Sequence, residues 1–189
     1  MLQQPTRTAR TLALAAAFAL VPAGAHAQAP SASTPRTAAL DDPTIVAIFD
    51  AANTWDVETG ALALRKSRTP AVRAFAQMMV RDHRAVRQQG RDLAAKLHVT
   101  PTPPGKDFAL AQDHATAMRT LQAARGAAFD TAYIDHEVAY HQAVIDAVTT
   151  QLLPATQNPE LKALEVKVAP NFQAHLAAAK QVQQGLGRK

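Results

Sequence analysis

The sequence contains no cysteine. This absence excludes disulfide bonds, thiolate metal ligands and a lipid attached to an N-terminal cysteine. Several catalytic patterns are missing as well: there is no Gly-x-Ser-x-Gly turn, no glycine-rich phosphate loop and no Cys-x-x-Cys-His motif for covalent heme. Nucleophilic hydrolysis and c-type heme chemistry therefore have no support in the sequence.

No apolar stretch reaches the roughly 20 residues that a membrane-spanning helix needs. The apolar run at residues 11–21 has about half of that length, follows Arg7 and Arg10, and precedes the small-x-small sequence Ala25-His26-Ala27. This order is typical of a secretory signal peptide, so we predict that residues 1–27 are cleaved after Ala27. An uncleaved anchor is the alternative, for which the run is short. We therefore expect a periplasmic protein without a transmembrane segment.

After the predicted signal peptide, residues 28–42 are rich in proline, serine, alanine and threonine. This composition predicts a disordered lead in front of a folded domain at residues 43–187. Within that domain one helix-start signal occurs three times, namely a capping side chain followed by proline. The three copies are Asp42-Pro43, Thr69-Pro70 and Asn158-Pro159.

Apolar periodicity extends these starts into helices, and no comparable signal for strands occurs. Pro170 lies inside the last predicted helix and is expected to kink or interrupt it. Four long amphipathic helices with one extended connection predict an all-α fold, a ferritin-like four-helix bundle with a long crossover connection that contains a shorter helix. The long helices are predicted over residues 43–66, 70–98, 127–152 and 159–184, and the shorter one over residues 106–124.

Three histidines, His83, His141 and His175, each stand in the apolar stripe of a different long helix. A stripe position faces the core, where an imidazole needs a polar partner. The pattern therefore predicts a buried polar site. Glu137 lies one turn before His141 on the same helix face, as a ligand beside it or as a group that supports it. By contrast, His114 is expected at the surface.

Imidazole and carboxylate donors suit Zn, Fe, Mn and Cu, and the facing helices of a bundle can assemble such donors in its core. Ferritin-like di-iron proteins use two Glu-x-x-His motifs, and this sequence has none. The metal hypothesis is therefore one divalent transition-metal ion in a histidine-rich site. The alternative is that each histidine is a neutral core residue, bonded to a nearby carboxylate or backbone carbonyl.

The stretch from Val57 to His83, VETGALALRKSRTPAVRAFAQMMVRDH, resembles a known family of bacterial proteins. It contains a Glu near a Leu/Ala run, a Ser-x-x-Pro turn and the sequence Phe-Ala-x-x-Met-Val-x-Asp-His. Phe129-Asp130-x-x-Tyr133 and Pro170-x-x-x-x-His175-Leu176 extend the match to about residues 43–186. The sequence is similar to the exported domain of unknown function 4142 family, which is described as ferritin-like and is sometimes labelled a predicted outer-membrane protein.

The resemblance implies a ferritin-like fold and export, and it carries over Glu58, Asp82, His83, His141 and His175 but not Glu137. We expect metal ligands among Glu58, His83, His141 and His175, with Asp82 or Glu137 as supporting hydrogen-bond partners. At 1.5 Å per residue, Glu58 lies roughly 12 Å from its hairpin turn and His83 roughly 20 Å from the same turn. A similar offset of several ångströms separates His141 from His175, so their convergence is not assured by the spacing.

Four arginines, Arg81, Arg84, Arg87 and Arg91, concentrate on one predicted helix outside its apolar stripe. They indicate either a contact surface for anions or an envelope protein, or a solvated helix face. The net charge of +5 falls to +3 without Arg7 and Arg10, and nucleic acid is not an expected partner of an exported chain with few aromatic residues. The alternative function is a metal-free helical interaction or stress-related protein of the cell envelope.

Overall fold

The computed structural model describes residues 40–104 and 108–187, and every regular element within these ranges is a helix. The predicted signal peptide and residues 28–39 of the predicted lead lie outside the described residues. Among the helices that are described, none combines the length and the apolar character needed to cross a membrane. The helices are α1 (Asp42–Lys66), α2 (Pro70–Lys96), α3 (Ala109–Ala123), α4 (Gly126–Ala147), the π-helix η1 (Val148–Leu152), α5 (Leu153–Ala155) and α6 (Pro159–Leu186).

The helix-start signals lie where helices begin, but only the Asn158 side chain caps its helix as predicted. The side chain of Thr69 makes no cap hydrogen bond and donates to Asp130 instead. The side chain of Asp41, rather than that of Asp42, caps α1 by accepting a hydrogen bond of 2.9 Å from the Thr44 backbone N–H. The carboxylate of Asp42 instead accepts from the backbone N–H groups of Gln157 and Asn158, both at 2.8 Å. Asp42 thereby ties the start of α1 to the turn before α6.

Pro170 does not interrupt its helix, because α6 runs continuously through this position, and a kink there stays a prediction. A proline inside a helix removes the hydrogen bond to the carbonyl four residues earlier, here that of Val166. Pro170 and Val166 both lie on the exposed side of α6, so water can hydrate the freed carbonyl. The predicted helix over residues 127–152 is α-helical to Ala147 and then continues as η1.

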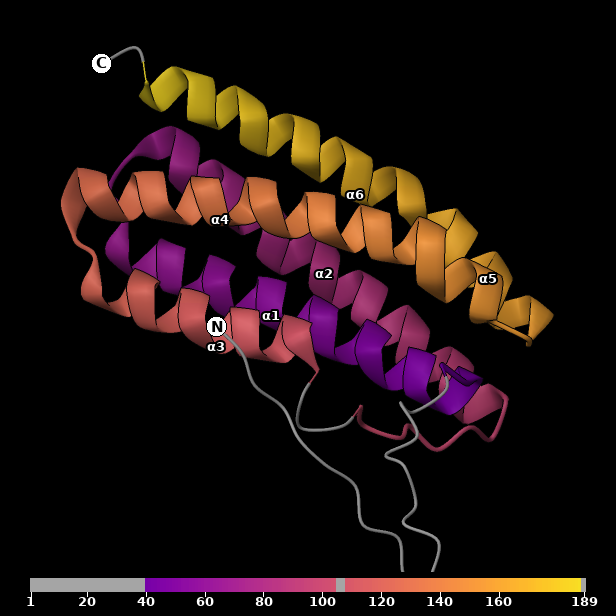
Figure 1. The fold of residues 1–189 in the computed structure, drawn as a ribbon. Helices are drawn as coiled ribbons and strands as arrows, with labels where there is room; N and C mark the ends of the chain where they lie inside the picture. Colours follow the sequence, from indigo (N-terminus) through magenta and orange to yellow (C-terminus); the bar gives the residue numbers. More distant parts are fainter. Residues whose placement is uncertain (1–39, 105–107, 188–189) are drawn as a thin grey trace, which may run out of the picture. The chain divides into compact units, whose positions relative to one another are not determined.

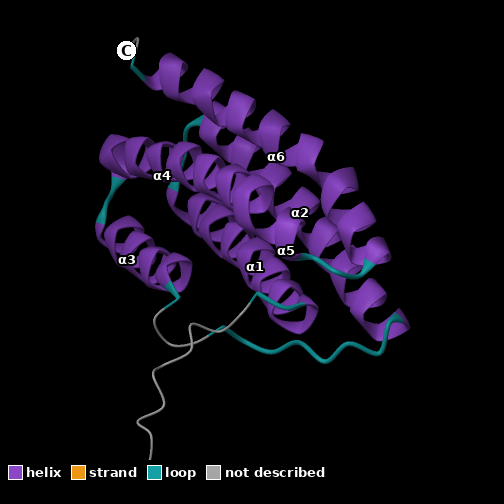
Figure 2. Ribbon diagram, turned by 45° about the vertical axis from the view of Figure 1, so that its right-hand side comes forward, coloured by secondary structure: helices purple, strands orange, loops and turns teal. Residues whose placement is uncertain are grey.

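The four long helices pack as two hairpins that close on each other (Figure 1). Helix α1 packs mainly against α2, α4 packs mainly against α6, and contacts of α2 with α6 and of α1 with α4 join the hairpins. The connection from α2 to α4 contains α3, which contacts α1 and α4 on the outside of the bundle (Figure 2). The expected four-helix bundle with a crossover that contains a shorter helix is confirmed.

The interior of the bundle is apolar at both ends and polar in between. One cluster of buried side chains includes Met79 and Ile134, and another includes Val86, Val144 and Phe172. On α2, His83 lies one turn after Met79 and nearly one turn before Val86, so the histidine is enclosed by the two clusters. The apolar packing thus shields the polar centre of the bundle from water.

Glycine at position 60 allows α1 to approach α2 closely. A Cβ atom there would lie 3.0 Å from Cγ2 of Val80 and 3.2 Å from the carbonyl oxygen of Ala76. We expect Gly60→Val to lower the free energy of unfolding by about 1–3 kcal/mol, because the added atoms force the helices apart. Gly185→Val is the matched control, since a Cβ at Gly185 meets nothing within 4 Å. Urea unfolding followed by circular dichroism measures both, and equal stability of the two variants would contradict the expectation.

Candidate metal centre

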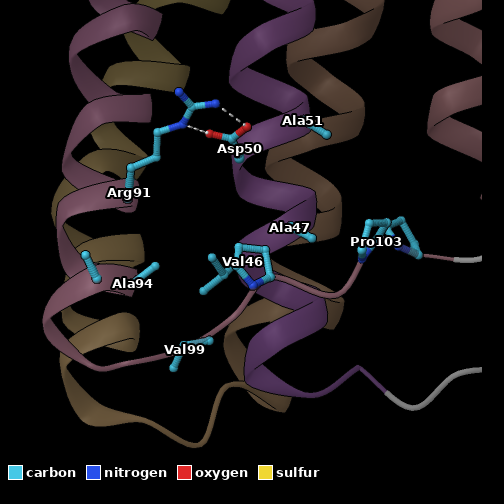
Figure 3. Close-up of a pocket in the computed structure, with 12 residues that line it drawn as sticks. Val46, Ala47, Asp50, Ala51, Arg91, Ala94, Val99 and Pro103 are labelled. Carbon is cyan, nitrogen blue, oxygen red and sulfur yellow. Dashed lines mark hydrogen bonds and ion pairs between the residues drawn. The ribbon is translucent and has the colours of Figure 1, made fainter.

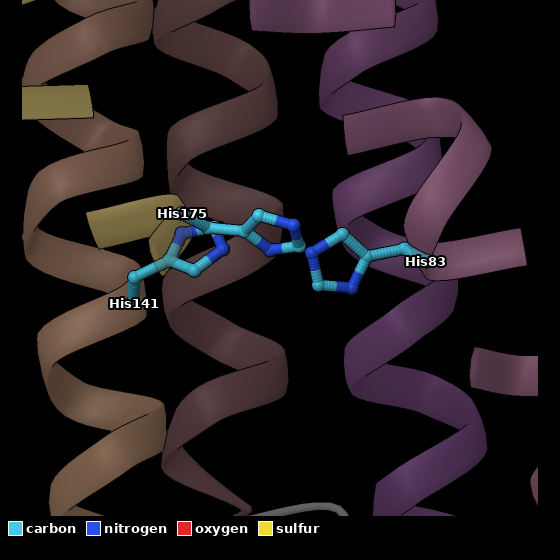
Figure 4. A group of neighbouring side chains, drawn as sticks. All are labelled: His83, His141 and His175. Atoms are coloured by element: carbon cyan, nitrogen blue, oxygen red, sulfur yellow. The ribbon is translucent and has the colours of Figure 1, made fainter. Parts of the chain in front are cut away.

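Three imidazoles meet in the middle of the bundle, each supplied by a different helix (Figure 4). His83 comes from α2, His141 from α4 and His175 from α6, and their exposed fractions are 1%, 0% and 4%. The ring centroids are 5.0–5.5 Å apart. One ring nitrogen from each residue can be chosen so that all three lie within 4.8 Å of one another.

Each imidazole has one nitrogen fixed by an oxygen acceptor. An oxygen acceptor within hydrogen-bond distance requires a hydrogen on the ring nitrogen that faces it. This sets the tautomer of a neutral ring. The amide of Asn53 is itself oriented, because its Nδ2 donates to the Phe49 carbonyl at 2.7 Å. The three pairs are Nδ1 of His83 with Oδ1 of Asn53 at 2.9 Å, Nδ1 of His141 with the Glu137 carbonyl at 3.0 Å, and Nε2 of His175 with Oδ2 of Asp82 at 3.1 Å.

The other nitrogen of each ring is buried and has no hydrogen-bond partner among the residues that the structure describes. These atoms are Nε2 of His83, Nε2 of His141 and Nδ1 of His175. In the tautomers set by the acceptors, each of these nitrogens carries a lone pair and no hydrogen. Three lone pairs without a donor in an apolar interior form an arrangement that a metal ion satisfies and that three separate core histidines do not need.

Burial keeps the three rings neutral. It lowers the pKa of His83 well below its ordinary value and lowers the pKa of His141 to about 3, and neighbouring imidazoles add to both effects. Burial also lowers the pKa of His175, although the carboxylate of Asp82 opposes this shift. A neutral imidazole is the form that binds metal, so the site does not have to release protons from its rings at neutral pH.

Two carboxylates lie beside the imidazoles. Asp56 on α1 places Oδ2 3.4 Å from Nδ1 of His83, and Glu137 places Oε2 3.5 Å from Nδ1 of His141. Thr59 donates to Oε1 of Glu137 at 2.9 Å. Burial raises the pKa of both carboxyls, and in Asp56 the negative charge of Glu137 raises it further. Asp56, Glu137 and His141 form a second group whose potential ligand atoms lie within 4.8 Å.

Sequence reasoning missed Asp56 and Asn53. Both are nearly inaccessible, with exposed fractions of 2% and 1%. A signal for Asp56 was present in the spacing of Ala52, Asp56 and Thr59, which continues the buried face of α1 through a charged residue. A charged residue on a buried stripe marks a paired or functional group, because the energetic cost of its burial has to be compensated.

The structure does not bring Glu58 to the three imidazoles. Its half-exposed carboxylate lies 3.0 Å from Nε2 of His114, on the crossover helix α3. The expectation that His114 lies at the surface is wrong, since its exposed fraction is 8% and its ring stacks on Trp55 with centroids 5.2 Å apart. The register estimate, which set Glu58 apart from His83 along the hairpin, agrees with this placement.

Three of the four arginines on the face of α2 are paired with carboxylates. Arg81 lies 2.6 Å from Asp82, and Arg87 and Arg91 lie 3.1 Å and 2.5 Å from Asp50. Two carboxylates therefore offset much of the positive charge of this face. The contact with an anionic surface or an envelope protein through Arg81, Arg84, Arg87 and Arg91 stays a prediction.

A pocket of about 520 Å³ lies away from the imidazoles, between α1, α2 and the segment that follows α2 (Figure 3). Its lining is mostly apolar, with Val46, Ala94 and Pro103 among the residues, and the Asp50–Arg91 ion pair borders it. None of the three histidines lines this pocket. It is therefore not a continuation of the candidate metal centre.

Comparisons with known proteins agree with the fold and name no activity. A family model described as "Domain of unknown function (DUF4142)" matches residues 26–182. Among curated proteins, none matches this chain.

Similar solved structures share the fold at low sequence identity. A DUF305 fragment from Deinococcus radiodurans has 16% identity and a TM-score of 0.63, over 78% of this chain and 95% of that chain. CopM in a Cu(II)-bound form has 18% identity and a TM-score of 0.59, over 77% of this chain and 98% of its own. CopM in an Ag-bound form has 19% identity and a TM-score of 0.58, over 77% and 96%.

The lowered pKa of His141 predicts how the stability of the metal-free protein depends on pH. Below its ordinary pKa of about 6.5, this imidazole takes up a proton in the unfolded chain, whereas the folded chain takes it up only near pH 3. Stability is therefore lost as the pH falls through this window, by at most about 1.4 kcal/mol per pH unit for one group. As the pH falls, the free energy of unfolding of the wild type should therefore decrease more than that of His141→Gln.

Urea unfolding at several pH values between about 4.5 and 7.5 measures this difference. The exposed His98 provides the matched control, and His98→Gln should follow the wild-type profile. Parallel profiles for wild type and His141→Gln would show that the ring does not stay neutral in the folded protein.

Proposed function

Because the chain belongs to the DUF4142 family, whose name assigns no activity, we propose a function from the site itself: the protein binds one transition-metal ion through His83, His141 and His175. The proposed ligand atoms are Nε2 of His83, Nε2 of His141 and Nδ1 of His175. The observation that carries this proposal is that these three buried nitrogens have no hydrogen-bond partner within residues 40–104 and 108–187, while the opposite nitrogen of each ring has one.

The alternative, three neutral core histidines, accounts for only half of the imidazole nitrogens. It explains the bonds to Asn53, to the Glu137 carbonyl and to Asp82. It leaves three lone pairs facing an apolar interior without a donor, which is costly for three residues at once. A metal ion compensates all three, and the outward hydrogen bonds then orient its ligands.

Three nitrogen donors favour zinc or copper over the other ions considered. Imidazole suits Zn, Cu and Fe, whereas Mn prefers carboxylate oxygens, and Fe²⁺ binds a given nitrogen site more weakly than Cu²⁺ or Zn²⁺ does. Glu58 is left out of the proposed ligand set, because its carboxylate pairs with His114. CopM, which has a similar fold, is described in Cu(II)-bound and Ag-bound forms. This makes copper the first ion to test, with zinc as the second.

We place this function in the periplasm, in keeping with the signal peptide predicted at residues 1–27. A cysteine-free site suits an exported protein, because imidazole ligands are not lost to disulfide formation in an oxidising compartment. Asp82 is partly exposed, with 27% of its side chain accessible, and it contacts the buried ring of His175. Of the three acceptor residues, Asn53, Glu137 and Asp82, only Asp82 is thus accessible to solvent to this extent.

Metal analysis of the purified protein tests the proposal. Untagged protein that has never met a chelator should carry about one equivalent of copper or zinc, measured by inductively coupled plasma mass spectrometry. His83→Ala and His175→Ala should each abolish this binding. His114→Ala is the matched control, since His114 is also buried and carboxylate-paired but lies outside the three-imidazole group.

Thermal unfolding with and without added metal ions gives the result that would contradict the proposal. A metal ion present at 100 times its dissociation constant stabilises the folded protein by about 2.7 kcal/mol. If the protein is purified without metal and its unfolding temperature does not change on addition of Zn, Cu, Fe or Mn, it does not have the proposed function.

The acceptor bound to His175 should set the affinity for the metal. We expect Asp82→Ala to weaken binding by about 10- to 100-fold, because the ring loses the group that fixes its tautomer and orientation. Asp92→Ala is the control on the same helix, where the exposed carboxylate only accepts from Gln88. Competition titration against a chromophoric chelator measures both affinities, and equal values would show that Asp82 does not orient a ligand.

A further inference from the structure

Two buried carboxylates lie beside the imidazoles without a full positive charge to balance them. Asp56 has an exposed fraction of 2% and Glu137 of 0%. In the described part of the chain, their ion-pair partners are His83 and His141, whose rings burial keeps neutral. Burying a carboxylate is costly unless a cation, a proton or a full set of hydrogen bonds compensates it.

Hydrogen bonds satisfy some oxygens of these two carboxylates and leave others without a partner. Thr59 donates to Oε1 of Glu137, whereas Oε2 of Glu137 and Oδ1 of Asp56 have no hydrogen-bond partner. The hydroxyl of Tyr133, a residue with an exposed fraction of 0%, also has none. After burial, the negative charges of Glu137 and Asp56 contribute most to raising the pKa of Tyr133.

We propose that Asp56 and Glu137 hold a second cation next to the three-imidazole site. The donors are oxygens, so the class of ion is a divalent cation that prefers oxygen, with Mn²⁺ as the probe. This inference rests on the proposed function in one respect: the neighbouring three-imidazole site is assigned to an ion that is bound by nitrogen. The core then contains two unlike positions, one rich in nitrogen and one rich in oxygen.

His141 connects the two positions. Its Nε2 is assigned to the three-imidazole site, and its Nδ1 lies 3.5 Å from Oε2 of Glu137. A metal on one nitrogen polarises the N–H on the other side of the ring. An ion bound at either position therefore affects the binding of an ion at the other position through the side chain of His141.

Titration of the metal-free, full-length protein with Mn²⁺ tests this inference, with the loss of the free Mn²⁺ signal in electron paramagnetic resonance as the readout. Wild type should bind one equivalent of Mn²⁺. Glu137→Gln and Asp56→Asn should each weaken this binding at least 10-fold.

Glu165→Gln is the matched control for Glu137→Gln. Glu165 has an exposed fraction of 2%, accepts from a threonine hydroxyl, that of Thr156, and has one oxygen without a partner. It lies outside both groups of potential ligands, so the substitution should leave Mn²⁺ binding unchanged. Circular dichroism of each variant confirms that it is folded.

The outcomes separate this inference from the proposed function. Wild type that binds copper or zinc but no Mn²⁺ overturns the second position and leaves the first intact, and this is also the result if the carboxyl pair holds a proton in place of a cation. Mn²⁺ binding that is equal in wild type and Glu137→Gln overturns it as well. Conversely, if His83→Ala and His175→Ala retain copper or zinc, the proposed function fails, while Mn²⁺ binding that depends on Glu137 still supports the second position.

Discussion

An imidazole has two nitrogens, and in a core that excludes water both of them need a partner. This requirement applies three times in the middle of this bundle, at His83, His141 and His175, whose exposed fractions do not exceed 4%. The described part of the chain supplies an acceptor to one nitrogen of each ring and no hydrogen-bond partner to the other. The remaining lone pairs, together with the depressed pKa values that keep the rings neutral, define the chemistry that the site can perform: it can bind a cation without first losing protons.

Different helices supply the imidazoles of this site and the groups that support them. Helices α2, α4 and α6 each supply one imidazole, while α1 supplies groups that support the site, among them Asn53, Asp56 and Thr59. Apolar clusters on both sides of the histidines keep water out, which strengthens every electrostatic interaction between them. The close approach of α1 to α2 at Gly60 holds the supporting helix against the helix that carries His83.

Much of the fold follows from local signals in the sequence, and part of the site does too. Proline after a capping residue marked the starts of α1, α2 and α6, and the apolar stripes placed the three histidines in the core. The expected offset between His141 and His175 was too large because it took the helix to end at Leu152. Helical structure continues through η1 and α5 to Ala155, which lies fourteen residues after His141, and His175 lies sixteen residues after Pro159. The partner of Glu58 depended on where the crossover helix α3 packs, which periodicity does not encode. Asp56 was missed although it continues the buried face between Ala52 and Thr59, because a charged residue is ordinarily assigned to a solvated face of a helix.

Anomalous diffraction from crystals of the copper- or zinc-loaded protein, collected at the absorption edge of the metal, tests the central claim most directly. The account predicts one strong anomalous peak within bonding distance, about 2.0–2.1 Å, of Nε2 of His83, Nε2 of His141 and Nδ1 of His175. A peak that lies elsewhere, for example between Glu58 and His114, or loaded crystals without any peak in the bundle core, would contradict it.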